Sequence, residues 1–161
     1  MDRISEVGLR VMLDLDRIQL GRLTQDIVQY RYVYVFGMGL AGIVGEHLRI
    51  RLARGGKNIF SLATPQFDMS LTPCRTDTLS IVVSQHGRTF LQTPDLLPYL
   101  VKNSNKTWLI TQEPRSRKFT GMETIYLQGD PDFLTVEYHI LTYLSELIGE
   151  GCRQLLEQDQ Q

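Results

Sequence analysis

The residues with the clearest capacity for chemistry lie in one short stretch, Ser84 to Thr89, with the sequence SQHGRT. It follows the apolar run 79–83, which is typical of a parallel strand buried on both faces. A glycine turn that opens a helix offers backbone N–H groups and the positive end of the helix dipole. We therefore expect an anion to bind at this turn, through Ser84, Gln85, His86, Gly87, Arg88 and Thr89.

Several of these side chains have a plainer alternative role. Ser84 and Thr89 could only cap the following helix, although capping and anion binding can coincide at one loop. Arg88 could instead form a surface ion pair. Of the three histidines in the chain, His86 is the one that we expect to contact a ligand.

A second glycine turn occurs earlier, directly after the apolar strand 32–36. Residues 37–42, GMGLAG, match the G-x-G-x-x-G dinucleotide fingerprint in its strand–turn–helix context. That fingerprint also requires an acidic residue at the end of the next strand to hold the ribose. The strand 58–63 ends without an acid, so we discount NAD and expect no cofactor. What remains is a close backbone approach to an anion or another strand, with Gly39, Leu40 and Ala41 as binding candidates.

The elements that must position these turns alternate along the chain. Helical patterns at about 40–54 and from Thr93 onward separate five expected strands, 32–36, 58–63, 79–83, 107–111 and 123–127. This alternation predicts an α/β fold, a three-layer, doubly wound five-stranded parallel sheet with the flavodoxin-like order 2-1-3-4-5. In that order the first and third strands are neighbours, and ligands bind outside their carboxyl ends. Both glycine turns are therefore expected at one crevice.

Two terminal helices complete the expected single domain, 1–161. Apolar residues recur at helical spacing over 2–28, with Asp2 as N-cap, and over 131–148, where Gly149 and Gly151 weaken the end. The N-terminal helix is apolar on two sides, which is typical of a helix buried against two surfaces. We expect both helices at a dimer interface; the alternative is one thick core contact.

Composition excludes several classes of protein. The 161 residues, 42% hydrophobic and 22% charged, suit one globular domain. The net charge of −1 gives no indication of a nucleic-acid surface, and no apolar run is long enough to span a membrane. Cys74 and Cys152 show neither CxxC nor Cys/His spacing, so we expect no metal site, no disulfide and a cytoplasmic location.

Two blocks of the sequence resemble the signature blocks of sugar isomerase (SIS) domains. They are YVFGMGLAGIVGEHLRIRLARGGKNIF and LSIVVSQHGRTFL, and the likeness extends over about 18–148. The chain looks most similar to the effector domain of RpiR-type sugar-responsive transcription regulators. The resemblance implies a phosphosugar-binding homodimer or homotetramer, whose serine/threonine-rich loop holds the ligand phosphate. By position, Ser84, Gly87 and Thr89 fall on the S-x-S-G-x-T pattern of that loop.

The sequence departs from the family pattern at two positions. His86 stands where the family usually has its middle serine, and Ala41 stands where the first block usually has a serine. Two hydroxyl donors to the phosphate would then be missing. His86 could donate in their place, best when protonated. The alternative is a site that binds weakly or binds something else.

The resemblance leaves two functions open. The preferred one is a non-catalytic phosphosugar sensor; the alternative is a small aldose–ketose isomerase. Such an isomerase needs an acid and a base, and the similar isomerases use Glu and His. The low-ranking catalytic candidates are Glu137, His139 and Glu46, with His47 beside the last. RpiR-type regulators carry an N-terminal helix-turn-helix domain for which 1–27 leave no room, so we expect an excised effector domain or a freestanding SIS protein.

Overall fold

The fold is built on one parallel sheet. The computed structural model describes residues 16–63, 76–85, 87, 92–112, 120–127, 134–159 and 161. The strands pair in the order β2-β1-β3-β4-β5, which confirms the predicted sheet. All four pairings are parallel. The strands are β1 (Tyr32–Gly37), β2 (Asn58–Ala63), β3 (Thr78–Val83), β4 (Lys106–Thr111) and β5 (Glu123–Tyr126).

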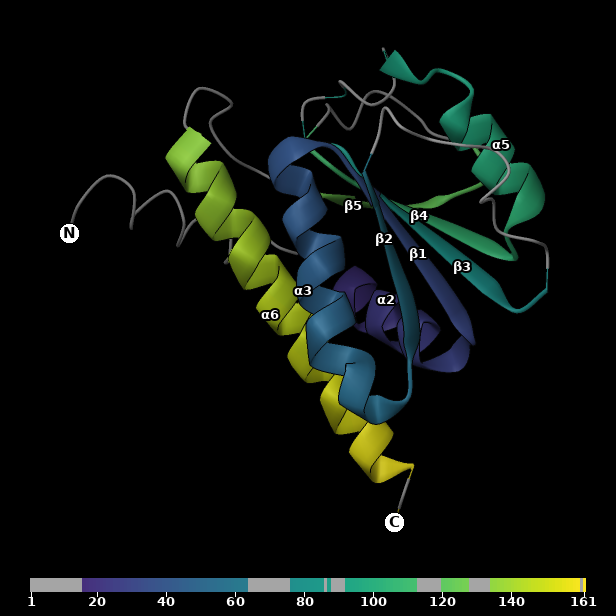
Figure 1. The fold of residues 1–161 in the computed structure, drawn as a ribbon, viewed down its shortest axis with the longest axis vertical. Helices are drawn as coiled ribbons and strands as arrows, with labels where there is room; N and C mark the ends of the chain where they lie inside the picture. Colours follow the sequence, from purple (N-terminus) through teal and green to yellow (C-terminus); the bar gives the residue numbers. More distant parts are fainter. Residues whose placement is uncertain are drawn as a thin grey trace.

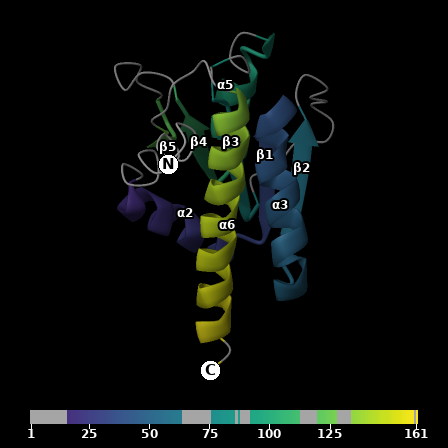
Figure 2. The same cartoon turned by 90° about the vertical axis from the view of Figure 1, so that its left-hand side faces the viewer.

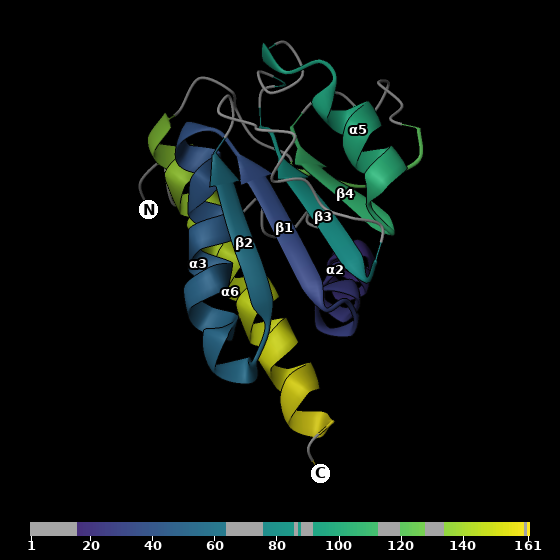
Figure 3. The ribbon, with the colours of Figure 1, turned by 45° about the vertical axis from the view of Figure 1, so that its right-hand side comes forward.

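The helices lie on both sides of this sheet. Figures 1 and 2 show α2, α3 and α6 together on one face, and Figure 3 shows α5 on the opposite face. The resulting three layers and strand order are those of a doubly wound α/β fold. The helical elements are α2 (Arg17–Gln29), η1 (Gly39–Ala41), α3 (Gly42–Leu52), η2 (Ala53–Gly55), α5 (Leu96–Asn103) and α6 (Leu134–Gln158).

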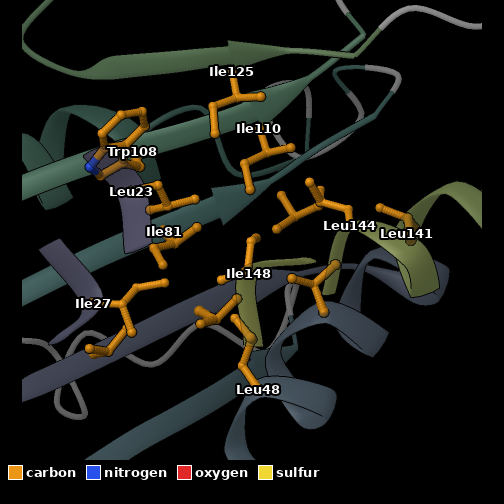
Figure 4. Close-up of a cluster of buried hydrophobic side chains, with 14 of the residues drawn as sticks. Leu23, Ile27, Leu48, Ile81, Trp108, Ile110, Ile125, Leu141, Leu144 and Ile148 are labelled. Carbon is orange, nitrogen blue, oxygen red and sulfur yellow. The ribbon is translucent and has the colours of Figure 1, made fainter. Parts of the chain in front are cut away.

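The larger core lies between the sheet and the three helices α2, α3 and α6. Trp108 and Ile81 of the sheet, Leu48 of α3 and Ile148 of α6 are almost completely buried there (Figure 4). A smaller cluster beneath α5 includes Phe36, whose side chain is also fully buried. Because burying one such side chain contributes about 1.5–3 kcal/mol, the larger core dominates the stability of the fold.

Polar contacts tie α2 to the amino edge of the sheet. Asp26 of α2 accepts hydrogen bonds from the indole Nε1 of Trp108 and the ammonium of Lys106, both at 2.7 Å. Lys57 donates to the carbonyl oxygens of Val28 and Tyr30 at the end of the same helix. Burial lowers the pKa of the Lys57 ammonium. The two Lys57 hydrogen bonds satisfy carbonyl groups at the helix end that have no partner within the helix.

The predicted helix 2–28 is interrupted by a helix cap at Asp16. Helix α2 starts at Arg17 because Asp16, in an extended conformation, accepts hydrogen bonds from the N–H groups of Ile18 and Gln19 and caps the helix. An unbroken helix over 2–28 is therefore wrong at Asp16, where an apolar periodicity concealed an N-cap. Residues 1–15, including the predicted cap Asp2, lie outside the described residues, as does Cys74.

The last helix runs ten residues beyond its predicted end. Helix α6 continues to Gln158 through both glycines that were expected to weaken it. A Cβ on Gly151 would lie 2.9 Å from Thr24 Cγ2 of α2, and one on Gly149 would lie 3.2 Å from Arg51 Nε of α3. The glycines thus allow close packing of three helices, and this packing outweighs their low helix propensity.

Candidate functional site

The two glycine turns leave the sheet from neighbouring positions. Gly37, the last residue of β1, pairs with Val83, the last residue of β3. The chain then enters η1 on one side and residues 84 and 85 on the other. This is the position at which the winding of the sheet reverses. The two glycine turns therefore start side by side, at the place where the sequence predicts a crevice.

The first turn folds tightly back on its own strand. A Cβ on Gly37 would lie 2.6 Å from the carbonyl carbon and oxygen of Ala41, so only glycine allows this approach. Gly39 has φ +55°, and the N–H of Ala41 donates to the carbonyl of Met38 at 3.0 Å. Helix α3 begins directly afterwards, which directs its positive dipole end to the carboxyl edge. The turn thus places a helix N-terminus there.

The second turn is held rigidly against β4. The N–H of Ser84 donates to Ile110 O at 2.9 Å, and Thr111 Oγ1 donates to Ser84 O at 2.6 Å. Ser84 is 4% exposed and Gln85 6%. Gly87 is buried with φ +68°, a conformation that glycine adopts without strain. His86, Arg88 and Thr89 lie outside the described residues.

Sequence reasoning missed a polar residue beside this turn. Gln112 follows β4 directly, and its N–H donates to Gln85 O at 3.0 Å. Its signal was present, because Thr111-Gln112 follows one apolar strand as Ser84-Gln85 follows another. Among the described residues, Gln85 Nε2 and both amide atoms of Gln112 are buried without a hydrogen-bond partner. The carboxyl edge therefore holds polar atoms that no described residue satisfies.

The acid–base candidates are dispersed. Glu46 of α3 forms an exposed ion pair with Arg49, and His47 contacts Glu146 of α6 at 2.9 Å. His139 is exposed, with its ring edge-on to Tyr138. The side chain of Glu137 lies outside what the structure describes. The first turns of α6 lie at the carboxyl end of the sheet (Figure 3), and α6 contacts η1.

The described part of the chain holds neither a metal site nor a helix that could span a membrane. It contains no group of three His, Cys, Asp or Glu side chains that could hold a metal ion. Within the same ranges, every helix is too short or too polar to cross a membrane. Cys152 is a free, buried thiol.

The sequence of this fold matches a known protein family. The family model for the SIS domain matches residues 26–141. The chain belongs to the SIS domain family. This assignment confirms the predicted family, and the match includes both glycine turns. No match was found among curated proteins.

Solved structures share this fold. A hypothetical protein from Methanococcus jannaschii, whose structure infers a 3-hexulose-6-phosphate isomerase function, is 23% identical with a TM-score of 0.68, covering 94% of this chain and 88% of that one. The sugar isomerase domain of an RpiR transcription factor from Sphaerobacter thermophilus is 18% identical with a TM-score of 0.67, covering 98% and 93%. Vibrio vulnificus NanR complexed with ManNAc-6P is 17% identical with a TM-score of 0.66, covering 94% and 59%.

Proposed function

We propose that this SIS domain binds a phosphorylated sugar and acts as the ligand-sensing module of an RpiR-type regulator or of a freestanding relative. The observation that carries the proposal is the pairing of Gly37 with Val83, because it starts both glycine turns at one switch point. The helix N-terminus after η1 supplies partial positive charge for a phosphate. Ser84 is fixed beside it by β4.

The similar structures support a sugar phosphate as the ligand class. The structure of NanR is a complex with ManNAc-6P, and the structure of the Methanococcus protein infers the function of a 3-hexulose-6-phosphate isomerase. For this chain, we expect Gly39, Leu40 and Ala41 to contribute from one turn. From the other turn we expect the residues of the Ser84–Thr89 stretch to contribute.

A thermal-shift panel tests this proposal. Inorganic phosphate, arabinose 5-phosphate, glucose 6-phosphate and N-acetylmannosamine 6-phosphate are added to the wild-type chain. A ligand at 100 times its Kd stabilises the folded state by about 2.7 kcal/mol, which raises the Tm of a chain of this size by about 5 to 10 °C. Failure of every sugar phosphate to raise the Tm would contradict the proposal.

Substitutions then locate the site. Ser84→Ala and Thr89→Ala should each reduce the ligand-induced shift. Ser80→Ala is the matched control, because Ser80 is a buried serine of β3, the strand that leads into the turn, and its hydroxyl pairs with Ser104 Oγ at 2.7 Å. This control should lower the Tm of the free protein and keep the shift. Equal shifts in all three variants would remove Ser84 and Thr89 from the site.

The second candidate function is sugar-phosphate isomerisation. It is favoured by one observation, the contact of α6 with η1, which brings the helix carrying Glu137 and His139 to the first glycine turn. An isomerase assay over pentose and hexose phosphates tests it. Turnover that Glu137→Gln abolishes and Glu46→Gln leaves unchanged would replace the sensor proposal with an enzyme.

We also propose that a second copy of this chain covers α2 and α6. A groove of about 280 Å³ lies between these helices and is lined in part by Leu20, Tyr143 and Leu147. Ile18 at the start of α2 is 78% exposed. Light scattering should show a dimer that Ile18→Asp weakens, while Ile50→Asp on the exposed side of α3 leaves it intact. A monomeric wild type would contradict this proposal.

A further inference from the structure

The carboxyl edge of β3 and β4 carries a pair of side-chain amides. The backbone bond from Gln112 N–H to Gln85 O fixes the two residues beside each other, one strand away from the β1–β3 switch point. Gln85 is 6% exposed, and its Nε2 atom has no hydrogen-bond partner among the described residues. The Nε2 and Oε1 atoms of Gln112 are in the same situation.

Such atoms are costly in a folded protein. A buried amide group without a partner destabilises the folded state by about 1–3 kcal/mol, and most buried polar atoms are therefore paired. The remaining unpaired polar atoms in the described ranges are the hydroxyls of Thr107 and Thr142 and His47 Nε2, which lies 2.9 Å from Glu146. In the described part of the chain, Gln85 and Gln112 are thus the one pair of backbone-bonded residues whose side-chain amides both have unpaired atoms.

The chemistry of the pair defines its ligand. A carboxamide is neutral and offers both donors and an acceptor, which suits hydroxyl groups, since each hydroxyl can also donate and accept. A second phosphate would instead favour cationic side chains. Neighbouring parallel strands are about 4.8 Å apart, so the distance from the β1–β3 crevice to β4 is within the length of a pentose or hexose phosphate.

We propose that Gln85 and Gln112 form a subsite that recognises sugar hydroxyls. This inference rests on the proposed function: the two glycine turns hold the phosphate, and the amide pair binds the sugar beyond it. The subsite determines which sugar phosphate is accepted, and Gln112, which lies outside both glycine turns, contributes nothing to the binding of phosphate alone. An analogue that lacks the recognised hydroxyl leaves the amides unpaired, which is the basis of strong discrimination in polar sites.

The test compares Gln112→Met with the wild-type chain by calorimetric titration. The probes are inorganic phosphate and the sugar phosphate of the panel that gives the largest thermal shift. Methionine keeps the length of glutamine and removes its hydrogen bonds. We expect about a tenfold higher Kd for the sugar phosphate and an unchanged Kd for inorganic phosphate. Unfolding of the free variant by urea should show equal or greater stability, because an unpaired amide has been removed.

The controls separate the possible failures. Gln154→Met makes the same change at an exposed residue of α6 whose amide contacts Glu150, and it should change neither Kd. Gln85→Met provides a second variant at the more buried residue and should also raise the Kd for the sugar phosphate. Because Gln85 belongs to the Ser84–Thr89 turn as well, an unchanged Kd for inorganic phosphate is expected of Gln112→Met alone. Wild-type binding of a sugar phosphate that both methionine variants retain would overturn the subsite while leaving the proposed function in place. Loss of stability in both variants, with unchanged sugar binding, would assign the amides a structural role. A wild-type chain that binds no sugar phosphate overturns the proposed function itself, and the subsite with it.

Discussion

The two edges of the sheet treat their polar groups differently. At the amino edge, Asp26 accepts from Trp108 and Lys106, and the N–H of Thr78 donates to Asn105 Oδ1 at 2.8 Å. Thr107 Oγ1 is the exception near that edge among the described residues. At the carboxyl edge, the described residues include three amide atoms that are buried without partners and two glycines with positive φ. The amino edge pairs most of its polar groups within the protein, whereas the carboxyl edge leaves amide atoms unpaired among the described residues, as the proposed ligand site requires.

This difference separates stability from binding. Changes at the amino edge should alter the free energy of unfolding and leave ligand affinity in the folded protein intact. Changes at the carboxyl edge should act mainly on affinity, because natural sites commonly lose stability in order to bind. Changes at Asp26, Gly37 and Cys152, in decreasing order of effect, test the roles of the two edges and of the core beside them.

Asp26→Ala should be the most destabilising change. It removes the carboxylate that pairs with the Lys106 ammonium and accepts the Trp108 indole N–H, and breaking such a buried pair costs about 3–5 kcal/mol. Urea unfolding measures the loss, and calorimetry at a temperature where the variant is folded should give the wild-type Kd. Arg22→Gln is the control on the same helix, because its ion pair with Glu123 is partly exposed and contributes about 1 kcal/mol or less. A weakened Kd in Asp26→Ala would break the separation of the two edges.

Gly37→Ala should affect both quantities. Its Cβ would meet the Ala41 backbone at 2.6 Å and displace the first turn, at a cost of about 1–3 kcal/mol and with loss of sugar phosphate binding. At Gly39 a Cβ would meet nothing within 4 Å, so Gly39→Ala costs only the positive φ, about 1 kcal/mol. Unfolding and titration of both variants check this order. The reverse order would show that steric closeness at Gly37 does not shape the turn.

Cys152, which lies on the α2–α6 side of the sheet, should make the free energy of unfolding depend on pH. Burial raises the pKa of its thiol from 9.0 to about 12, so the folded state holds the proton that the unfolded chain releases. The stabilisation is complete below pH 9 and declines as pH rises toward 12. In a Cys74→Ser background, the stability of the Cys152 protein relative to Cys152→Ala should fall by about 1.4 kcal/mol between pH 7 and pH 10. A difference that does not change over this interval would show that the thiol is hydrated.

The sheet and its switch point were predictable because strand patterns are local. Runs such as 79–83 are apolar except for Ser80, and their alternation with helices leaves few topologies open. The ends of α2 and α6 were not predictable in the same way. Asp16 caps a helix within a continuous apolar periodicity, and Gly151 is tolerated because Thr24 packs against it. The Asp16 cap is a local contact that the periodicity concealed, whereas the tolerance of Gly151 depends on a contact between distant segments.

The candidate site was predictable in its backbone and less so in its side chains. The glycine spacing indicated the turns at Gly37 and Gly87, and the strand order brought the starts of the turns together. Gln112 was missed because its importance arises from its pairing with Gln85 across two strands. A polar residue directly after a buried strand is the signal that could have identified it.

An amide NMR titration with the sugar phosphate that stabilises the chain most would test the location of the proposed site. We expect ligand to shift the N–H signals of the residues at the proposed site: Leu40, Ala41, Ser84, Gln85, Gly87 and Gln112. Those of Asp26, Lys57, Thr78 and Lys106 at the amino edge should stay in place. Shifts centred on the amino edge, or on the α2–α6 groove alone, would contradict a sugar phosphate site at the carboxyl ends of β1, β3 and β4.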